Sequence, residues 1–155
     1  MNEFMKISKD LANENLKSNE GGPFGACVVK NGKVIGRGSN KVLLTNDPTA
    51  HAEIMAIRDA CKNINSYDLS GCEMYINCFP CPMCLSAIIW SNIKTIYYGN
   101  TKEDAMKLGF KDNDIYKYFS SLCSDDKVIK LIQIDRDETI KEFQNFEKKK
   151  DKTIY

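Results

Sequence analysis

The residues best suited to chemistry fall in two short stretches. His51, the only histidine of the chain, stands two residues before Glu53, and Cys81 and Cys84 follow about thirty residues later at CxxC spacing among prolines. One imidazole and two thiolates form a three-ligand set for zinc, which leaves the metal an open position for water. A nearby carboxylate such as Glu53 can move protons for that water. The two stretches together predict a catalytic zinc site.

Other interpretations of these residues stay open at this point. Cys78 and Cys81 form a second, overlapping CxxC, and with Cys78 as a fourth ligand the zinc would be closed and purely structural. The cysteines could also serve redox chemistry, although this leaves the histidine and the glutamate without a role. Residues at i and i+2, such as His51 and Glu53, do not share a face inside a regular helix. The site is therefore expected to straddle the first turn of a helix.

The composition is typical of a globular chain of one-domain size. Of its 155 residues 43% are hydrophobic and 28% are charged, and the net charge is +1. This balance argues against the electrostatic footprint of a nucleic-acid binder, so no nucleic-acid partner is expected. Met1–Lys6 contains no apolar stretch, and the apolar run Ala87–Trp90 is too short to cross a bilayer. We therefore expect a cytoplasmic protein with reduced thiols and no membrane association.

The rest of the chain predicts the elements that position these groups. Apolar spacing predicts helices over residues 3–18, 48–63, 81–91, 103–107 and 139–149. Asp47 is the expected N-cap of the second helix, with Pro48 at its first position. Asn31-Gly32 between two apolar runs predicts a β-hairpin. Further strands are expected at residues 73–77, 95–98 and 128–134. The stretch 109–126 is less regular and is a candidate region for binding residues.

Strands that alternate with helices after an initial hairpin indicate an α/β fold. We expect a three-layer α/β/α sandwich on a five-stranded mixed sheet. No internal repeat and no linker interrupts the pattern, so residues 1–155 are expected to form a single domain.

His51-Ala52-Glu53 followed by Pro80-Cys81-Pro82-Met83-Cys84 resembles the signature of the cytidine deaminase-like superfamily of zinc deaminases. Within that superfamily the chain is similar to bacterial guanine deaminases over most of its length. The matching segments are Gly22–Ala26, Asn40, Asn46–Glu53, Gly109–Tyr116 and the terminal Tyr155. One departure is Phe79, where relatives commonly carry glutamate before the Pro-Cys pair.

The resemblance implies hydrolytic deamination of guanine, a purine base, to xanthine and ammonia. Zn²⁺ would be held by His51, Cys81 and Cys84, and Glu53 would relay protons. The same resemblance leaves cytosine, a nucleoside or an adenosine of transfer RNA as alternative substrates. A zinc-stabilised binding module without activity is the alternative outside enzymology.

The resemblance also assigns a set of substrate-binding residues, namely Phe24, Asn40, the Ala52 backbone, Trp90, Asp112 and Tyr155. The chemistry is suitable, because a carboxylate accepts from the ring N–H groups of guanine and an amide suits its carbonyl and N7. Each residue also has a plain structural explanation, such as a turn, a core position or a chain terminus. The resemblance further implies a homodimer in which the C-terminal segment, about residues 137–155, crosses over so that Tyr155 closes the partner's site.

Overall fold

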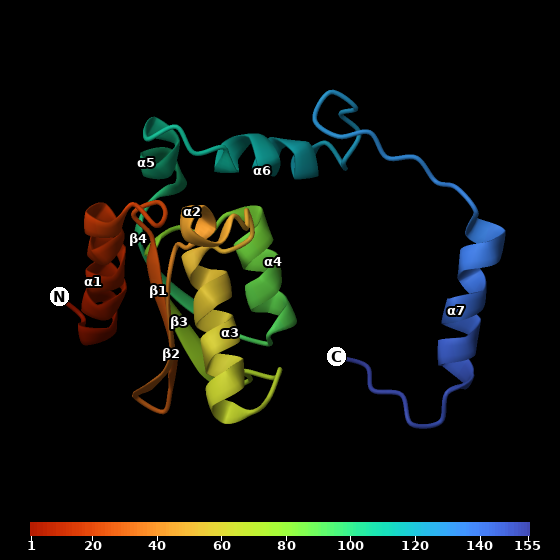
Figure 1. The fold of residues 1–155 in the computed structure, drawn as a ribbon, viewed down its shortest axis with the longest axis horizontal. Helices are drawn as coiled ribbons and strands as arrows, with labels where there is room; N and C mark the ends of the chain where they lie inside the picture. Colours follow the sequence, from red (N-terminus) through yellow and green to blue (C-terminus); the bar gives the residue numbers. More distant parts are fainter. The chain divides into compact units, whose positions relative to one another are not determined.

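The computed structural model describes all 155 residues, which group into two compact units. The first unit is Met1–Lys117 and the second is Tyr118–Tyr155. Figure 1 shows the order of the helices and strands along the chain. None of the helices combines the length and the apolar character that a bilayer crossing needs.

A four-stranded mixed sheet forms the centre of the first unit. β1 (Gly25–Lys30) pairs antiparallel with β2 (Lys33–Ser39) on one side and with β3 (Cys72–Cys78) on the other. β3 pairs parallel with β4 (Thr95–Asn100), so the strand order is β2-β1-β3-β4. In many α/β proteins, ligands bind just beyond the carboxyl ends of parallel strands such as β3 and β4.

The β1–β2 hairpin confirms the prediction made from Asn31-Gly32. Lys30 pairs with Lys33, so the loop between the strands has two residues. Asn31 and Gly32 have φ angles of 50° and 73°. Positive φ at both positions is what a tight two-residue hairpin turn requires, and it explains the choice of asparagine and glycine.

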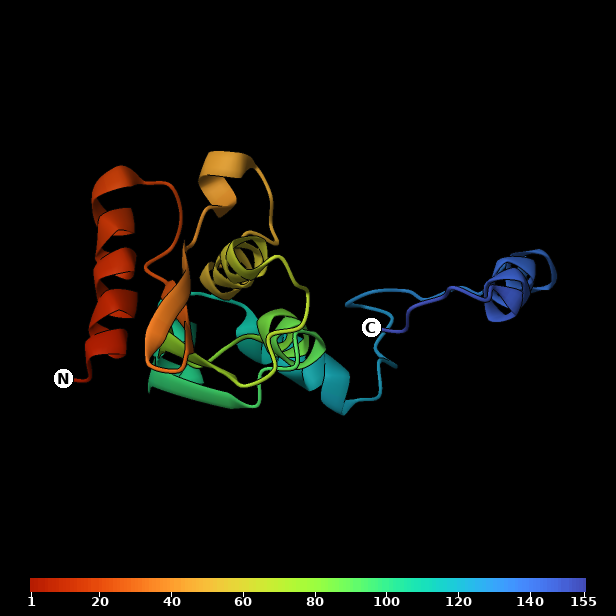
Figure 2. The same ribbon diagram turned by 90° about the horizontal axis from the view of Figure 1, so that it is seen from below.

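Helices cover both faces of the sheet, as seen in Figures 1 and 2. Successive strand residues point to opposite faces, and β1 uses both. On one face Cys27 and Val29 pack with Phe4 and Ile7 of α1 (Glu3–Ser18). On the other face, Ala26 and Val28 belong to a core cluster with residues of α3 (Ala52–Ile64) and α4 (Pro82–Trp90). The α/β/α sandwich is therefore present.

Two glycines of β2 let α3 approach the sheet closely. A Cβ atom at Gly38 would lie 2.2 Å from the Ala52 carbonyl oxygen, and one at Gly36 would lie 2.5 Å from the Ala56 carbonyl oxygen. Both distances are far below van der Waals contact. The glycines thus fix the depth at which the first turn of α3 sits, and this turn carries His51 and Glu53.

The predicted start of α3 is wrong by four residues. The helix begins at Ala52, and His51 is its N-cap, with extended backbone angles of φ −70° and ψ 158°. Asp47 instead stabilises a local turn, because its Oδ1 accepts from the Thr49 N–H at 2.8 Å and the Thr49 hydroxyl at 2.6 Å. The segment before α3 also contains the short helix α2 (Val42–Thr45), which the sequence did not predict.

The sheet has four strands, so the five-stranded prediction is wrong. Residues 128–134 are irregular, and their side chains are all exposed. A turn opens this segment, in which the N–H groups of Val128 and Ile129 donate to the Asp125 carbonyl. The apolar pattern resembled a strand, but a strand also needs a neighbour whose hydrogen-bonding edge is available, and local sequence does not provide one.

Three helices follow the sheet along the chain. α5 (Lys102–Lys107) was predicted, whereas α6 (Asp112–Ser120) lies in the less regular stretch 109–126, where no helix was predicted. α7 (Arg136–Lys148) matches the predicted last helix, with an earlier start. None of the residues of α7 is buried.

Candidate active site

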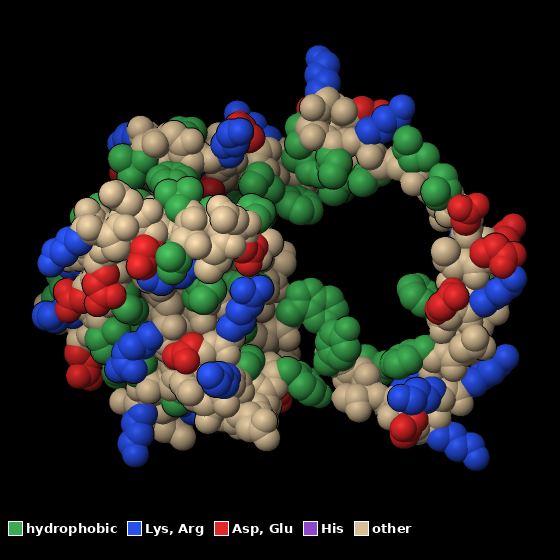
Figure 3. Space-filling view, viewed as in Figure 1, with side chains coloured by type: hydrophobic (Ala, Val, Ile, Leu, Met, Phe, Trp, Pro, Cys, Tyr) green, Lys and Arg blue, Asp and Glu red, His purple; other side chains and the backbone are tan.

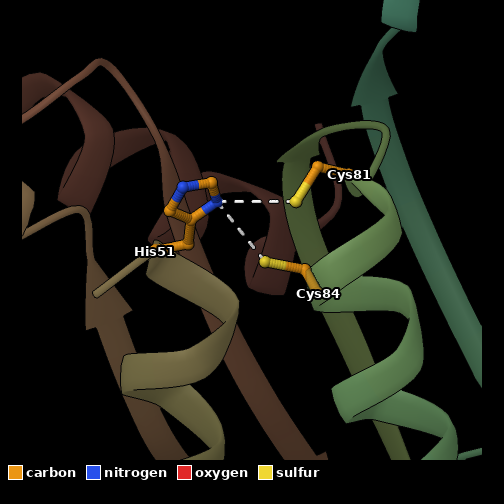
Figure 4. A group of neighbouring side chains, drawn as sticks. All are labelled: His51, Cys81 and Cys84. Carbon is orange, nitrogen blue, oxygen red and sulfur yellow. Dashed lines mark hydrogen bonds between the residues drawn. The ribbon is translucent and has the colours of Figure 1, made fainter. Parts of the chain in front are cut away.

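Three predicted metal ligands come together between the starts of two helices (Figure 4). His51 is the N-cap of α3, Cys81 is the N-cap of α4, and Cys84 lies in the first turn of α4. The Nδ1 atom of His51 lies 3.6 Å from the Cys81 sulfur and 3.5 Å from the Cys84 sulfur. These three residues are the only group of histidine, cysteine and acidic side chains in the chain that is arranged to hold a metal ion.

The spacing of the three donor atoms fits zinc. Zinc–sulfur and zinc–nitrogen bonds of about 2.3 and 2.0 Å at tetrahedral angles place the nitrogen about 3.5 Å from each sulfur. Both measured distances agree with this value. A single imidazole N–H, in contrast, points at one acceptor, so a hydrogen bond alone does not explain two sulfurs equally near one nitrogen. Thiolates with imidazole are also a donor set that favours zinc.

The electrostatics of the site favour a thiolate. The Cys84 thiol, which donates to the Cys81 sulfur, holds the pKa of Cys81 at about 4. The same hydrogen bond raises the pKa of Cys84, so one proton is shared between the two sulfurs. The hydrogen bond to Cys81 also raises the pKa of His51. The positive ends of α3 and α4 stabilise negative charge at this point as well.

Cys78 stays outside the ligand group. It ends β3, and its thiol donates to the Thr101 carbonyl at 3.6 Å. Burial raises the pKa of Cys78 to about 11, so this thiol stays protonated at neutral pH. Three protein ligands therefore face a metal here, as in catalytic zinc sites, whereas structural sites have four.

Glu53 lies beside the ligand group, in the first turn of α3. Only 6% of its surface is exposed, and this burial raises its pKa to about 7. His51 and Glu53 are two residues apart and would point to different sides of a regular helix. They can lie at the same site because His51 precedes the helix with extended backbone angles and only Glu53 is inside it. A carboxyl group that titrates near neutrality can both accept and release a proton at working pH.

A small cavity of about 40 Å³ adjoins these groups. Its lining combines metal ligands, two acidic side chains, an amide and aromatic rings. The lining residues are Phe24, Asn40, His51, Glu53, Ile76, Cys78, Phe79, Cys81, Phe110 and Asp112. A hollow lined by a few polar groups among apolar ones is typical of small-molecule sites.

Asn40 is held rigidly at the wall of the cavity. It is buried, and its Oδ1 accepts from the Val42 N–H at 3.1 Å. Its carbonyl oxygen accepts from the Asn15 amide at 2.7 Å, and its N–H donates to the Phe24 carbonyl at 3.1 Å. A Cβ atom at Gly21 would lie 2.2 Å from the Asn40 Oδ1, so only glycine fits there. With Oδ1 engaged, the Nδ2 donor is the part of the amide left for a ligand.

Asp112 reaches the cavity from the first turn of α6. Burial raises the pKa of its carboxyl group. α6 is anchored beside the metal-binding turn, because the Tyr116 hydroxyl donates to the Pro80 carbonyl at 2.7 Å. Phe79 fills the space next to this contact and packs on Tyr98 and Tyr116, with ring centroids 5.1 and 6.3 Å away. Phe79, the departure from the family pattern, thus has an aromatic environment that suits it.

Three predicted substrate-binding residues are not among the residues that line the cavity. Trp90 ends α4, about 13 Å along the helix axis from Cys81, and is 67% exposed. Tyr155 belongs to the second unit and is 79% exposed. Ala52 is the first residue of α3, with its side chain in the core. Its backbone N–H is in the first turn, where helix N–H groups have no carbonyl partner within the helix.

Four cavity residues were not among the predicted site residues, namely Ile76, Cys78, Phe79 and Phe110. Ile76 and Cys78 alternate along β3, so the strand that leads into the cysteine motif carries a signal for both. Phe110 stands two residues before Asp112, and a loop residue two positions from a predicted contact is a reasonable candidate.

Comparisons with known proteins agree with this geometry. Residues 1–100 match the family described as the cytidine and deoxycytidylate deaminase zinc-binding region. The chain belongs to this family. Its cofactor is therefore zinc, and His51, Cys81 and Cys84 are the residues suited to hold it.

Individual relatives extend the similarity beyond the family region. A guanine deaminase of Bacillus subtilis is 43% identical over 151 residues, which is 96% of each chain. The X-ray structure of a guanine deaminase from Bacillus subtilis superposes with a TM-score of 0.91 at 41% identity, over 100% of this chain and 99% of that one. A tRNA-specific adenosine deaminase of Buchnera aphidicola is 41% identical over 128 residues, covering 83% of this chain and 82% of the relative.

Proposed function

We propose that the protein hydrolyses guanine to xanthine and ammonia. The observation that carries this proposal is the 43% identity to a guanine deaminase along 96% of both chains. The similarity continues past residue 100, where the family region ends, and so includes the segment with Phe110 and Asp112. The site is thus proposed to share its substrate as well as its metal with that relative.

The cavity offers groups complementary to guanine. The Asn40 Nδ2 can donate to the carbonyl oxygen or to N7, and the Asp112 carboxylate can accept from ring N–H groups. The Phe24 ring provides an apolar face for a planar base. Asn40 directly follows β2, and Asp112 is the first residue of α6. Two polar contacts from separate directions would fix the orientation of the base in its plane.

The reaction adds water at C2 of guanine and releases the amine at that carbon as ammonia. Zinc, when bound, lowers the pKa of a water molecule so that it can act as a nucleophile near neutral pH. Glu53 would take one proton from the attacking water and deliver it to the ring nitrogen N3. It would then take the second proton, from the hydroxyl group formed at C2, and deliver it to the departing amine, so that the C2 carbonyl of xanthine forms as ammonia leaves. The pKa of Glu53 near 7 suits both steps. The apolar and aromatic lining would keep bulk water away from the carboxylate.

The proposal predicts the order of activity over a panel of bases. Purified zinc-loaded protein is expected to release ammonia from guanine at least about tenfold more efficiently, in kcat/KM, than from cytosine or adenine. Ammonia release is measured for guanine, cytosine, adenine, cytidine and a transfer RNA with adenosine at the wobble position. If cytosine or the transfer RNA is deaminated while guanine is not, the proposed substrate is wrong. The assignment to the deaminase class would still hold.

We also propose a homodimer in which the C-terminal segment, about residues 137–155, covers the partner's site. Support comes from the uncovered apolar side chains of the second unit, some of them visible in Figure 3. Phe143, Phe146, Ile154 and Tyr155 are all exposed in the single chain. α7 buries none of its residues, which is unusual for a helix with apolar positions unless a further surface covers it.

Deletion of Thr153–Tyr155 is expected to lower kcat/KM for guanine by at least about tenfold, because a closed site excludes water better than an open one. The thermal melting temperature should stay within a few degrees of the wild-type value, since these side chains are exposed. Light scattering determines the oligomeric state of both proteins. Unchanged kinetics would remove Tyr155 from the site, and a monomeric wild-type protein would contradict the crossed dimer.

We further propose a reducing compartment such as the cytoplasm. All seven cysteines are free thiols, and two of them serve as zinc ligands only when they are not oxidised.

A further inference from the structure

Phe110 contributes an aromatic ring to the catalytic cavity. Its ring lies edge-on to that of Phe24, with centroids 4.8 Å apart and an interplanar angle of 74°. This arrangement is favourable for two aromatic rings, because the positive edge of one meets the negative face of the other. Phe110 therefore fixes the orientation of Phe24, the ring suited to stack on the base.

Gly22 completes the packing around the two rings. A Cβ atom at Gly22 would lie 2.9 Å from the Phe24 Cε2 atom and 3.1 Å from the Phe110 Cζ atom. A side chain at this position would meet both rings, so the absence of a Cβ at Gly22 leaves the room that the aromatic pair occupies.

The local backbone holds Phe110 in this position. Helix α5 starts with a capping box between Thr101 and Asp104, which fixes its first turn. After the helix the chain turns through Gly109, whose φ of 93° is accessible mainly to glycine. The Phe110 N–H then donates to the Ala105 carbonyl at 3.3 Å. Phe110 is therefore placed by a defined helix end rather than by a loose loop.

A larger cavity of about 500 Å³ lies next to the catalytic one. Phe24 and Cys78 line both cavities, so these two side chains form a shared wall. Phe110 lines only the catalytic cavity, whereas Leu108, two residues earlier, lines only the larger one. As long as Phe110 holds Phe24 in place, the catalytic cavity stays small and separate.

We propose that Phe110 is a specificity-determining residue that restricts the site to free bases and excludes purine nucleosides. The inference rests on the proposed deamination of guanine. In a nucleoside the sugar is attached at N9 of the five-membered ring, away from the amine at C2. The sugar is a non-planar group that needs space beside the base. Phe24, which Phe110 holds in place, closes that space. Without Phe110, the Phe24 ring can turn and the two cavities merge.

The test compares guanine with guanosine as substrates of zinc-loaded Phe110→Ala. The ratio of kcat/KM for guanine to that for guanosine is expected to fall at least about tenfold, through gain of guanosine turnover and loss of guanine binding. Phe110→Leu, which keeps most of the apolar volume, should retain a ratio closer to the wild-type value. Leu108→Ala is the matched control from the same turn, and its ratio should not change.

An unchanged ratio in Phe110→Ala, with wild-type zinc content and a cooperative thermal transition, would overturn the proposal. If Phe110→Ala does not fold, the smaller Phe110→Val takes its place, and an unchanged ratio in Phe110→Val overturns the proposal equally. Failure of the proposed function is distinguishable, because it appears as absence of guanine turnover in the wild-type protein. In that case the same ratio, measured for whichever base the wild-type protein deaminates and its nucleoside, still decides the role of Phe110.

Discussion

Replacement of Glu53 by glutamine is expected to lower kcat for guanine by about a hundredfold or more, with one zinc ion per chain retained. Glutamine has nearly the same shape as glutamate, so the packing of this buried side chain is kept. It cannot carry a proton between the attacking water and the departing amine. Burial brings the pKa of Glu53 to about 7, so this carboxyl group can accept and release a proton near neutral pH. The amide of glutamine does not titrate in this range.

Ammonia release measures the loss of turnover, and elemental analysis after desalting measures zinc. Glu73→Gln is a matched control, because Glu73 lies on β3, accepts from the Tyr75 hydroxyl at 3.3 Å and does not line the cavity. Loss of zinc in Glu53→Gln would mean that Glu53 binds the metal, and near-normal turnover would show that another group carries the protons. A larger KM with unchanged kcat would indicate a role in binding alone.

Local signals were sufficient for the elements whose cause is local. The Asn31-Gly32 turn and the apolar face of α1 both depend on residues a few positions apart. The predicted strand at residues 128–134 failed because strand pairing depends on a distant edge, which a mostly apolar run of residues cannot supply. α6 was missed for a related reason, since one of its anchors, the Tyr116–Pro80 hydrogen bond, joins residues 36 positions apart.

The site was predictable where residue type alone restricts the chemistry. A lone histidine, a CxxC pair and a neighbouring glutamate have few joint uses, so the ligand group could be named before its geometry was known. The helix start was harder, because Asp47-Pro48 carries the stronger capping signal, although His51 is the actual N-cap. The role proposed for Phe110 could not be read from the sequence, since it depends on the contact with Phe24, 86 positions earlier.

Replacement of Cys84 by serine is expected to abolish zinc binding and, with it, deamination. Serine has a similar size, but its hydroxyl is a far weaker zinc ligand than a thiolate. Cys84 is completely buried in the first turn of α4, and its sulfur is 3.5 Å from the His51 Nδ1. Two remaining protein ligands cannot complete a catalytic zinc set. The zinc content should therefore fall from one per chain to a small fraction, and ammonia release should fall to background.

Cys78→Ser is the informative control, since it places the same substitution six residues earlier. Serine can keep the hydrogen bond that Cys78 donates to the Thr101 carbonyl, so this variant should retain its zinc and most of its activity. A metal ion that binds only the folded protein stabilises the folded state. The melting temperature should therefore fall in Cys84→Ser and change little in Cys78→Ser. Equal loss of zinc in both variants would indicate a closed site of four ligands. Such a site has no position left for water, and the protein would then be a zinc-stabilised binding module instead of an enzyme.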